Sequence, residues 1–89
     1  MPVVFFTRHL RSVAPDEPIA CSGQTLRAAL DDALSRHGRL RSYVLDEQGR
    51  IRQHVAIFVD NQHLTGPDIL DAPVKSDSEI YVMQALSGG

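Results

Sequence analysis

Apolar residues recur along this chain with two different periods. From His54 to Val59 every second residue is β-branched, which is the pattern of a strand with one buried face. Residues 3–10 and 79–86 are rich in β-branched and aromatic side chains, and they predict a first and a last strand. Shorter strands are expected at residues 19–21, after two prolines, and at residues 62–64, after a polar turn.

One segment has the period of a helix. It follows Ser22 and Thr25, either of which can cap a helix, and its apolar residues recur every three or four positions: Leu26, Ala29, Leu30, Ala33 and Leu34. Gly38 stands where a left-handed C-terminal cap would end this helix. Residues 40–45 are then expected to form a short extended piece.

The order of these elements predicts an α+β fold, with one main helix packed across a mixed sheet of four or five strands. One further helical turn is expected around residues 69–71. The first and last strands are the most hydrophobic, so we expect them side by side at the centre of the sheet, in parallel. The chain is thus predicted to be one domain over residues 1–86, followed by a flexible tail at residues 87–89.

Composition narrows the class of protein. The chain has 89 residues, of which 43% are hydrophobic and 22% charged, so it is expected to fold as one globular domain. The formal net charge is -2 and the basic residues are dispersed, which argues against nucleic acid as a partner. The apolar start is too short to cross a membrane and lacks the features of an export signal. A single cysteine fits a reducing, cytoplasmic setting.

The chemistry-bearing side chains form no catalytic or metal-binding pattern. Cys21 is expected to be a small, partly buried hydrophobe, and Asp31-Asp32 a solvated face of the helix. There is no glycine-rich phosphate loop, and the histidines have no ligand-like spacing: His9, His37, His54 and His63. We therefore expect no metal, no bound cofactor and no catalytic residues, which indicates a protein that is not itself an enzyme.

The last three residues, Ser87-Gly88-Gly89, have no apolar group to bury and are expected to project from the last strand. Without a Cβ atom, glycine can pass through a narrow slot in another protein and adopt the dihedral angles that the slot requires. The carboxylate at Gly89 would become an electrophile when activated as an acyl-adenylate, and a sulfur or amine nucleophile could then attack it. Such a tail is typical of a group carrier served by partner enzymes.

Four segments together resemble one family: Val-Val-Phe-Phe at residues 3–6, Gly-Gln-Thr-Leu at 23–26, Val-Ala-Ile-Phe-Val-Asp-Asn at 55–61, and Ala-Leu-Ser-Gly-Gly at 85–89. The chain resembles the MoaD/ThiS group of sulfur carriers over essentially its whole length. This resemblance implies a ubiquitin-like β-grasp fold. It also implies that a ubiquitin-activating-type adenylyltransferase uses ATP to adenylate Gly89.

The resemblance further implies two kinds of partner beyond the activating enzyme. A cysteine desulfurase or a rhodanese-type donor would supply sulfur, giving a C-terminal thiocarboxylate that a sulfur-accepting enzyme then consumes. Ser87 and Gly88 would thread the active sites of these partners. The pathway that receives the sulfur stays open, because residues 39–52 form a longer segment than thiamine-pathway carriers usually have.

Three alternatives stay open beside the sulfur carrier. The chain could be the small subunit of molybdopterin synthase, or a protein modifier conjugated through Gly89, or a β-grasp interaction module with an incidental glycine end. Lys75 is the only lysine, which disfavours a modifier that builds chains on itself.

A partner-docking surface is expected on the sheet face that the helix leaves open. Neighbouring residues of a strand point to opposite faces, so one of Phe5 and Phe6 must face away from the helix. We expect this surface to contain Phe6, with Arg8, Arg11 and Met83 around it. The alternative is that the segment 39–52 covers the same face.

Overall fold

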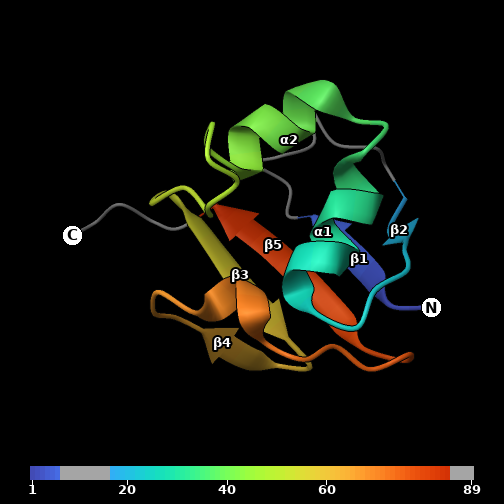
Figure 1. The fold of residues 1–89 in the computed structure, drawn as a ribbon. Helices are drawn as coiled ribbons and strands as arrows, with labels where there is room; N and C mark the ends of the chain where they lie inside the picture. Colours follow the sequence, from blue (N-terminus) through green and yellow to red (C-terminus); the bar gives the residue numbers. More distant parts are fainter. Residues whose placement is uncertain (7–16, 85–89) are drawn as a thin grey trace.

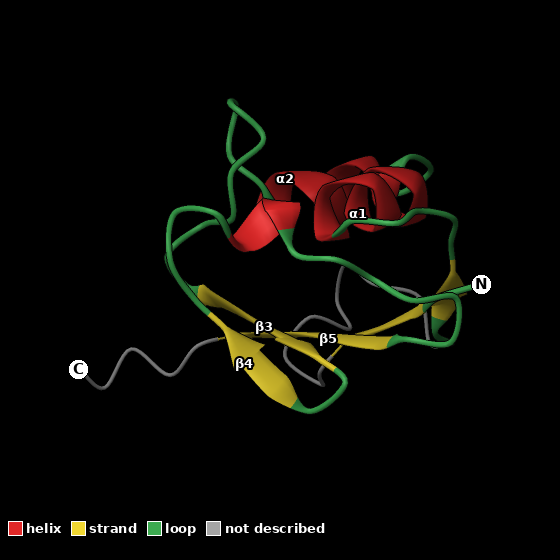
Figure 2. Cartoon of the chain, turned by 60° about the horizontal axis from the view of Figure 1, so that its bottom comes forward, coloured by secondary structure: helices red, strands yellow, loops and turns green. Residues whose placement is uncertain are grey.

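Five short strands form one mixed sheet, and two helices pack on one side of it (Figures 1 and 2). The computed structural model describes residues 1–6 and 17–84. Its strands are β1 (Val3–Phe6), β2 (Ile19–Ala20), β3 (Val55–Val59), β4 (Gln62–Leu64) and β5 (Glu79–Gln84). Its helices are α1 (Leu26–Leu34) and α2 (Gly38–Val44), with a 3₁₀ turn, η2 (Ile69–Asp71), between β4 and β5.

The strand order is β2-β1-β5-β3-β4, so β5 lies at the centre of the sheet (Figure 1). β5 runs parallel to β1 and antiparallel to β3, and the outer strands β2 and β4 are each antiparallel to their neighbours. The prediction that the first and last strands pair in parallel is confirmed. The long excursion between β1 and β5 carries the helices, which cover one face of the sheet.

The core lies between this face and the helices. The predicted apolar stripe of α1 is buried in full, and Thr25 is confirmed as its cap because its hydroxyl accepts a hydrogen bond from the N–H of Ala28 at 3.2 Å. The sheet supplies the opposing side chains: Val4, Val55, Ile57, Val59, Ile80 and Val82. Each fully buried Leu or Ile side chain in this layer stabilises the fold by about 1.5–3 kcal/mol.

Residues 38–44 correct two expectations from the sequence. The segment 40–45 was expected to be extended, but most of it is helix α2, so the sheet carries two helices rather than one main helix. Gly38 begins α2 and has no positive φ, so it is not a left-handed cap of α1. The physical reason is that Leu40 and Val44, four residues apart, both enter the core on one face of α2.

Gly23 allows α1 to approach the segment that leads into it. A Cβ atom on this residue would lie 2.5 Å from the backbone nitrogen of Ala29 and 2.9 Å from the carbonyl carbon of Ala28, and its φ is +155°. Backbone atoms cannot move aside as a flexible side chain can. A side chain at position 23 would therefore displace the first turn of α1.

The turn between β3 and β4 is tied to the beginning of β5. Asp60 and Asn61 both have positive φ, at 51° and 69°, as a two-residue type I′ hairpin requires. The Asp60 carboxylate accepts hydrogen bonds from the hydroxyl of Ser78 at 2.8 Å and from the N–H of Glu79 at 3.0 Å. The N–H of Glu79 first, and the Ser78 hydroxyl second, hold the pKa of the Asp60 carboxyl below its ordinary value of 3.8.

Two glycine variants test this account of the helices. Gly23→Ala should lower the free energy of unfolding by about 2 kcal/mol or more, because backbone atoms of α1 stand where the methyl group must go. Gly38→Ala should raise it by about 0.5–1 kcal/mol, because α2 leaves open space there and alanine favours a helix. Urea denaturation of both variants measures the two changes. A stabilised Gly23→Ala protein, or a Gly38→Ala protein destabilised as a broken cap would be, contradicts the structure.

Asp60→Asn tests the link between the hairpin and β5. Because the folded pKa lies below 3.8, the carboxylate stabilises the fold at neutral pH, and this contribution is lost as the pH falls below about 4. The variant keeps a residue that tolerates positive φ but removes the charge, so its stability should fall less steeply between about pH 5 and pH 3. Thermal unfolding across this range is the measurement. Asp68→Asn, in an exposed loop, is the matched control and should keep the wild-type slope.

Candidate functional site

The strand that leads to the glycine tail is the best-anchored strand of the sheet. β5 pairs with β1 over four residues and with β3 over five. Gln84, its last residue, pairs with Val55 at the beginning of β3. Ser87, Gly88 and Gly89 lie outside the described residues, so their roles and the boundary at residue 86 stay predictions. The structure describes the base of the tail, which is the central strand itself.

A row of four rings crosses the sheet on the face opposite the helices. Phe5 on β1 pairs with Tyr81 on β5, Tyr81 with Phe58 on β3, and Phe58 with His63 on β4. The rings stack as two pairs. Phe5 and Tyr81 have centroids 4.6 Å apart at 11°, and Phe58 and His63 have centroids 4.7 Å apart at 19°. We call Phe5, Tyr81, Phe58 and His63 the aromatic row.

Met83 lies one step nearer the tail than the aromatic row. It pairs with Ala56, and both side chains point to the same face as Tyr81 because they are two residues along their strands. A shallow hollow of about 250 Å³ opens here, lined by Phe58, Asn61, Tyr81 and Met83. Met83 is therefore on the open face, as expected from the sequence.

Phe6 is not on this face, which corrects the expected docking surface. It follows the buried Val4 by two residues, so it points toward the helices, where it is partly buried against the core. Phe5 takes the outward position. Arg8 and Arg11 lie outside the described residues. The sequence alone does not reveal that Tyr81, Phe58 and His63 belong to one surface, because joining them requires the register of four strands.

The segment 39–52 does not cover the aromatic row. Its helix α2 packs beside α1 on the other side of the sheet (Figure 2), and Leu40, Val44 and Leu45 are core residues. In the described part of the chain, the face that carries the aromatic row has no helix on it. The alternative expectation, that the segment 39–52 covers this face of the sheet, is therefore wrong.

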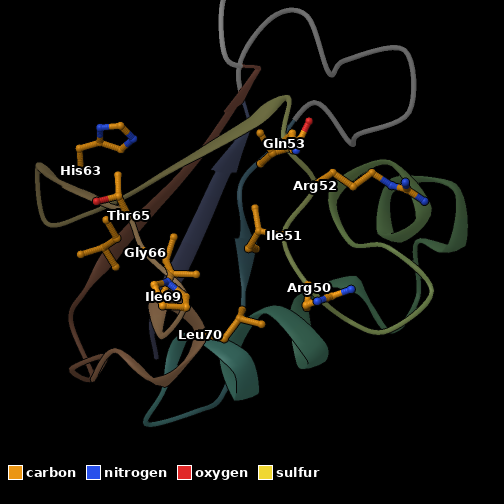
Figure 3. A pocket seen from close by; sticks show the side chains of 12 residues that line it. Arg50, Ile51, Arg52, Gln53, His63, Thr65, Gly66, Ile69 and Leu70 are labelled. Atoms are coloured by element: carbon orange, nitrogen blue, oxygen red, sulfur yellow. The ribbon is translucent and has the colours of Figure 1, made fainter.

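A second hollow, of about 310 Å³, lies on the helix side between residues 50–53 and 63–70 (Figure 3). Ile51, Ile69 and Leu70 line its apolar part. The side chain of Arg52 extends away from it (Figure 3), and its Nε donates a hydrogen bond to the carbonyl of Ser42 at 2.8 Å. The lining of this hollow contains no carboxylate, and we assign no ligand to it.

Cys21 is buried, as expected, and is not placed for thiol chemistry. It has no exposed surface, and its Sγ lies 3.5 Å from the carbonyl oxygen of Pro2. Burial first, and the nearby Asp32 carboxylate second, raise the pKa of the thiol above its ordinary value. Since the thiolate is the reactive form, Cys21 functions as a small core residue.

The described histidines lie apart. His37 precedes α2, His54 and Tyr43 have ring centroids 4.8 Å apart at 81°, and His63 belongs to the aromatic row. Within residues 1–6 and 17–84, no three histidine, cysteine or carboxylate side chains converge as metal ligands. No helix in this part of the chain has both the length and the hydropathy needed to cross a bilayer.

Comparison with known families decides where this fold belongs. A model of the ThiS family matches residues 4–89, which is nearly the whole chain. The chain belongs to the ThiS family. The resemblance to the MoaD/ThiS group of ubiquitin-like sulfur carriers is thereby confirmed, and the match of this ThiS-family chain extends through Gly88 and Gly89. Among curated proteins, no sequence matches it significantly.

Solved structures share the fold of this ThiS-family chain at low sequence identity. A chain of the BexX/CysO complex from Amycolatopsis orientalis matches with a TM-score of 0.84 and 22% identity, covering 100% of both chains. CysO of Mycobacterium tuberculosis, an antigen, has a TM-score of 0.82 and 18% identity, with 97% of this chain and 100% of CysO covered. Small archaeal modifier protein 1 of Methanosarcina acetivorans has a TM-score of 0.83 and 19% identity, with coverages of 99% and 95%. The fold is a ubiquitin-like β-grasp.

Alanine variants of Phe5 and Phe6 test which of these two side chains of β1 faces the core. Phe6→Ala should lower the free energy of unfolding by about 2–3 kcal/mol, because a partly buried ring leaves the core. Phe5→Ala should cost about 1 kcal/mol, the value of one exposed aromatic stack. Both variants make the same change in one strand, so their difference in urea denaturation reports the facing. Equal losses, or a larger loss for Phe5→Ala, would contradict the assignment.

Proposed function

We propose that this ThiS-family chain is a sulfur carrier that holds sulfur as a thiocarboxylate on Gly89. The observation that supports the proposal most strongly is that the central strand β5 leads directly toward the terminal glycines. A tail anchored in this way is presented on a rigid body, so a partner can grip the domain and guide the carboxylate into its active site. The chain is then a co-substrate of partner enzymes and no enzyme itself.

The chemistry proceeds in two steps on the partner enzyme. A ubiquitin-activating-type adenylyltransferase joins the Gly89 carboxylate to ATP, releasing pyrophosphate and leaving an acyl-adenylate. A sulfur nucleophile from a cysteine desulfurase or rhodanese-type donor then displaces AMP. If that donor is a persulfide, a second thiol must reduce the resulting acyl disulfide to free the thiocarboxylate. Ser87 and Gly88 pass through the partner's channel, where small side chains avoid clashes.

The aromatic row and Met83 form the surface that we assign to docking of the activating enzyme. Three features support it: the rings are on the face opposite the helices, they are partly exposed, and Tyr81 and Met83 lie on the strand that leads to the tail. Stacked and partly exposed aromatic rings are typical of an interaction surface. The structural relative from Amycolatopsis was solved as a BexX/CysO complex, which favours a protein partner here as well. A sulfur-accepting enzyme and a cytoplasmic setting stay predictions.

A protein modifier is the second candidate function. The similarity to structures named small archaeal modifier protein 1 favours it, since a modifier uses the same activation of a C-terminal glycine. An amine would then attack the acyl-adenylate in place of sulfur. The small subunit of molybdopterin synthase is a special case of the carrier, in which the sulfur acceptor is a permanent partner.

Intact mass spectrometry tests the proposal. The full chain is incubated with the activating enzyme of its own organism, ATP and a sulfur donor. Replacement of OH by SH should add about 16 Da to the chain. Deletion of Gly89 should abolish this gain, whereas Ser87→Ala, which keeps both glycines, should retain it.

The same experiment separates the alternatives. If the chain gains no sulfur but appears in higher-mass conjugates that require Gly89, the modifier is the better description. If neither product forms, or if the Gly89 deletion is loaded as well as the intact chain, the proposal fails.

A further inference from the structure

The aromatic row consists of two stacked pairs of rings with a hollow between the pairs. Its outer rings, Phe5 and His63, each stack on an inner ring, and the inner rings Tyr81 and Phe58 both line the hollow of about 250 Å³. The hollow therefore lies where the two stacked pairs meet. Tyr81 and Phe58 are directly opposite each other across β5 and β3, so a side chain entering the hollow would contact both rings.

Polar and negatively charged groups lie at the hairpin end of this apolar site. Asn61 contributes its amide to the lining. Glu79 precedes Tyr81 by two residues on the same face, which places it about 7 Å along the strand. Asp60 is next to Asn61 in the hairpin and lies beside Glu79, to whose carbonyl its own N–H donates a hydrogen bond.

Lys75 lies near Asp60 and helps to lower the pKa of its carboxyl, so that carboxylate is partly balanced. Glu79 is different, because the described strand residues of this face include no positive side chain. These strand residues are Val3, Phe5, Ala20, Ala56, Phe58, His63, Glu79, Tyr81 and Met83. Lysine and arginine are absent from this set. The hollow thus combines two aromatic faces, a thioether and an amide, with the Glu79 carboxylate next to it on the same face.

Arginine is the side chain that uses all of these groups. Its planar guanidinium stacks on aromatic rings, is weakly hydrated and pairs with carboxylates through several N–H donors. Lysine is a compact and strongly hydrated charge that gains less from two rings. Leucine would fill the space but leave Asn61 and Glu79 unused.

We propose that this hollow is a socket for an arginine side chain of the partner protein that receives the tail. The assignment of the partner rests on the proposed function, whereas the chemistry of the socket stands on the residues described above. Tyr81 is eight positions before Gly89, and an extended chain spans at most about 3.6 Å per residue. The partner's arginine therefore lies within about 29 Å of the site where that partner activates Gly89.

A titration with matched peptides tests the socket without any activating enzyme. The ¹⁵N-labelled full chain is titrated with Ac-Gly-Gly-Arg-Gly-Gly-NH₂ and with two peptides that carry lysine or leucine at the centre. The arginine peptide should bind weakly but saturably and shift the amide signals of Phe58, Asn61, Tyr81 and Met83. It should bind about threefold more tightly than the lysine peptide, because the planar guanidinium stacks on aromatic rings and is more weakly hydrated than an ammonium.

Variants of the chain sharpen this result. Tyr81→Leu should weaken the arginine peptide by about fivefold, because one stacking ring is lost. Glu79→Gln should weaken it by about threefold at low salt and less at high salt, because the paired charges are exposed. Asp68→Asn removes the same charge from a loop and is the control that should change nothing.

Several outcomes overturn the socket. Equal binding of the arginine and lysine peptides would indicate a general charge effect, and tighter binding of leucine would indicate an aliphatic anchor. Shifts elsewhere, or none, would mean that the hollow binds no such side chain. Failure of the chain to gain sulfur counts against the proposed function and leaves the titration untouched.

The role of the socket in partner binding is tested in the sulfur-loading reaction. Glu79→Gln and Tyr81→Leu should raise the KM of the activating enzyme for the carrier by similar factors, with kcat unchanged. Unchanged KM values would overturn the assignment of the socket to this partner, even if sulfur loading itself proceeds.

Discussion

The pairing of β5 with both β1 and β3 is the constraint on which the rest of this structure depends. It places Ile80 and Val82 under the helices, where they are buried, and Tyr81 and Met83 on the opposite face. One strand therefore contributes to the core with one set of residues and to the proposed docking surface with the other. Its register also aligns the four rings of the aromatic row, since each ring lies opposite the next. In the sequence, the C-terminal tail comes directly after this strand.

Much of this fold could be predicted because local patterns and tertiary packing agree. The stripe of α1, the alternation in β3 and the family resemblance lead to the same sheet with a helix across it. The helix α2 escaped prediction because Tyr43, Val44 and Leu45 also suit a strand, and the burial of Leu40 with Val44 decided the conformation. Gly38 was misinterpreted for the same reason, since a cap is expected where a helix is thought to end.

The candidate site was harder to predict from the sequence than the fold. The alternation of side chains along a strand predicts that Phe5 and Phe6 face opposite ways. It does not say which of them faces the core, and only the burial of Val4 decides this. The aromatic row draws one residue from each of four strands that are far apart in the chain. A sequence carries no direct signal for such a cross-strand alignment, because a shift of one residue in any register would move a ring to the other face. The terminal glycines, in contrast, can be read directly from the sequence, and their role stays a prediction.

The two hydrogen bonds that the Asp60 carboxylate accepts from Ser78 and Glu79 have a mechanical consequence. They fasten the beginning of β5 to the β3–β4 hairpin, at the end of the strand farthest from the tail. A force applied at the tail would act along β5 and load its ladders with β1 and β3 in shear, so that many hydrogen bonds must break together. Strands pulled in this direction resist better than strands peeled apart one bond at a time. In the proposed function, a partner that pulls on the tail would therefore meet a domain that stays folded.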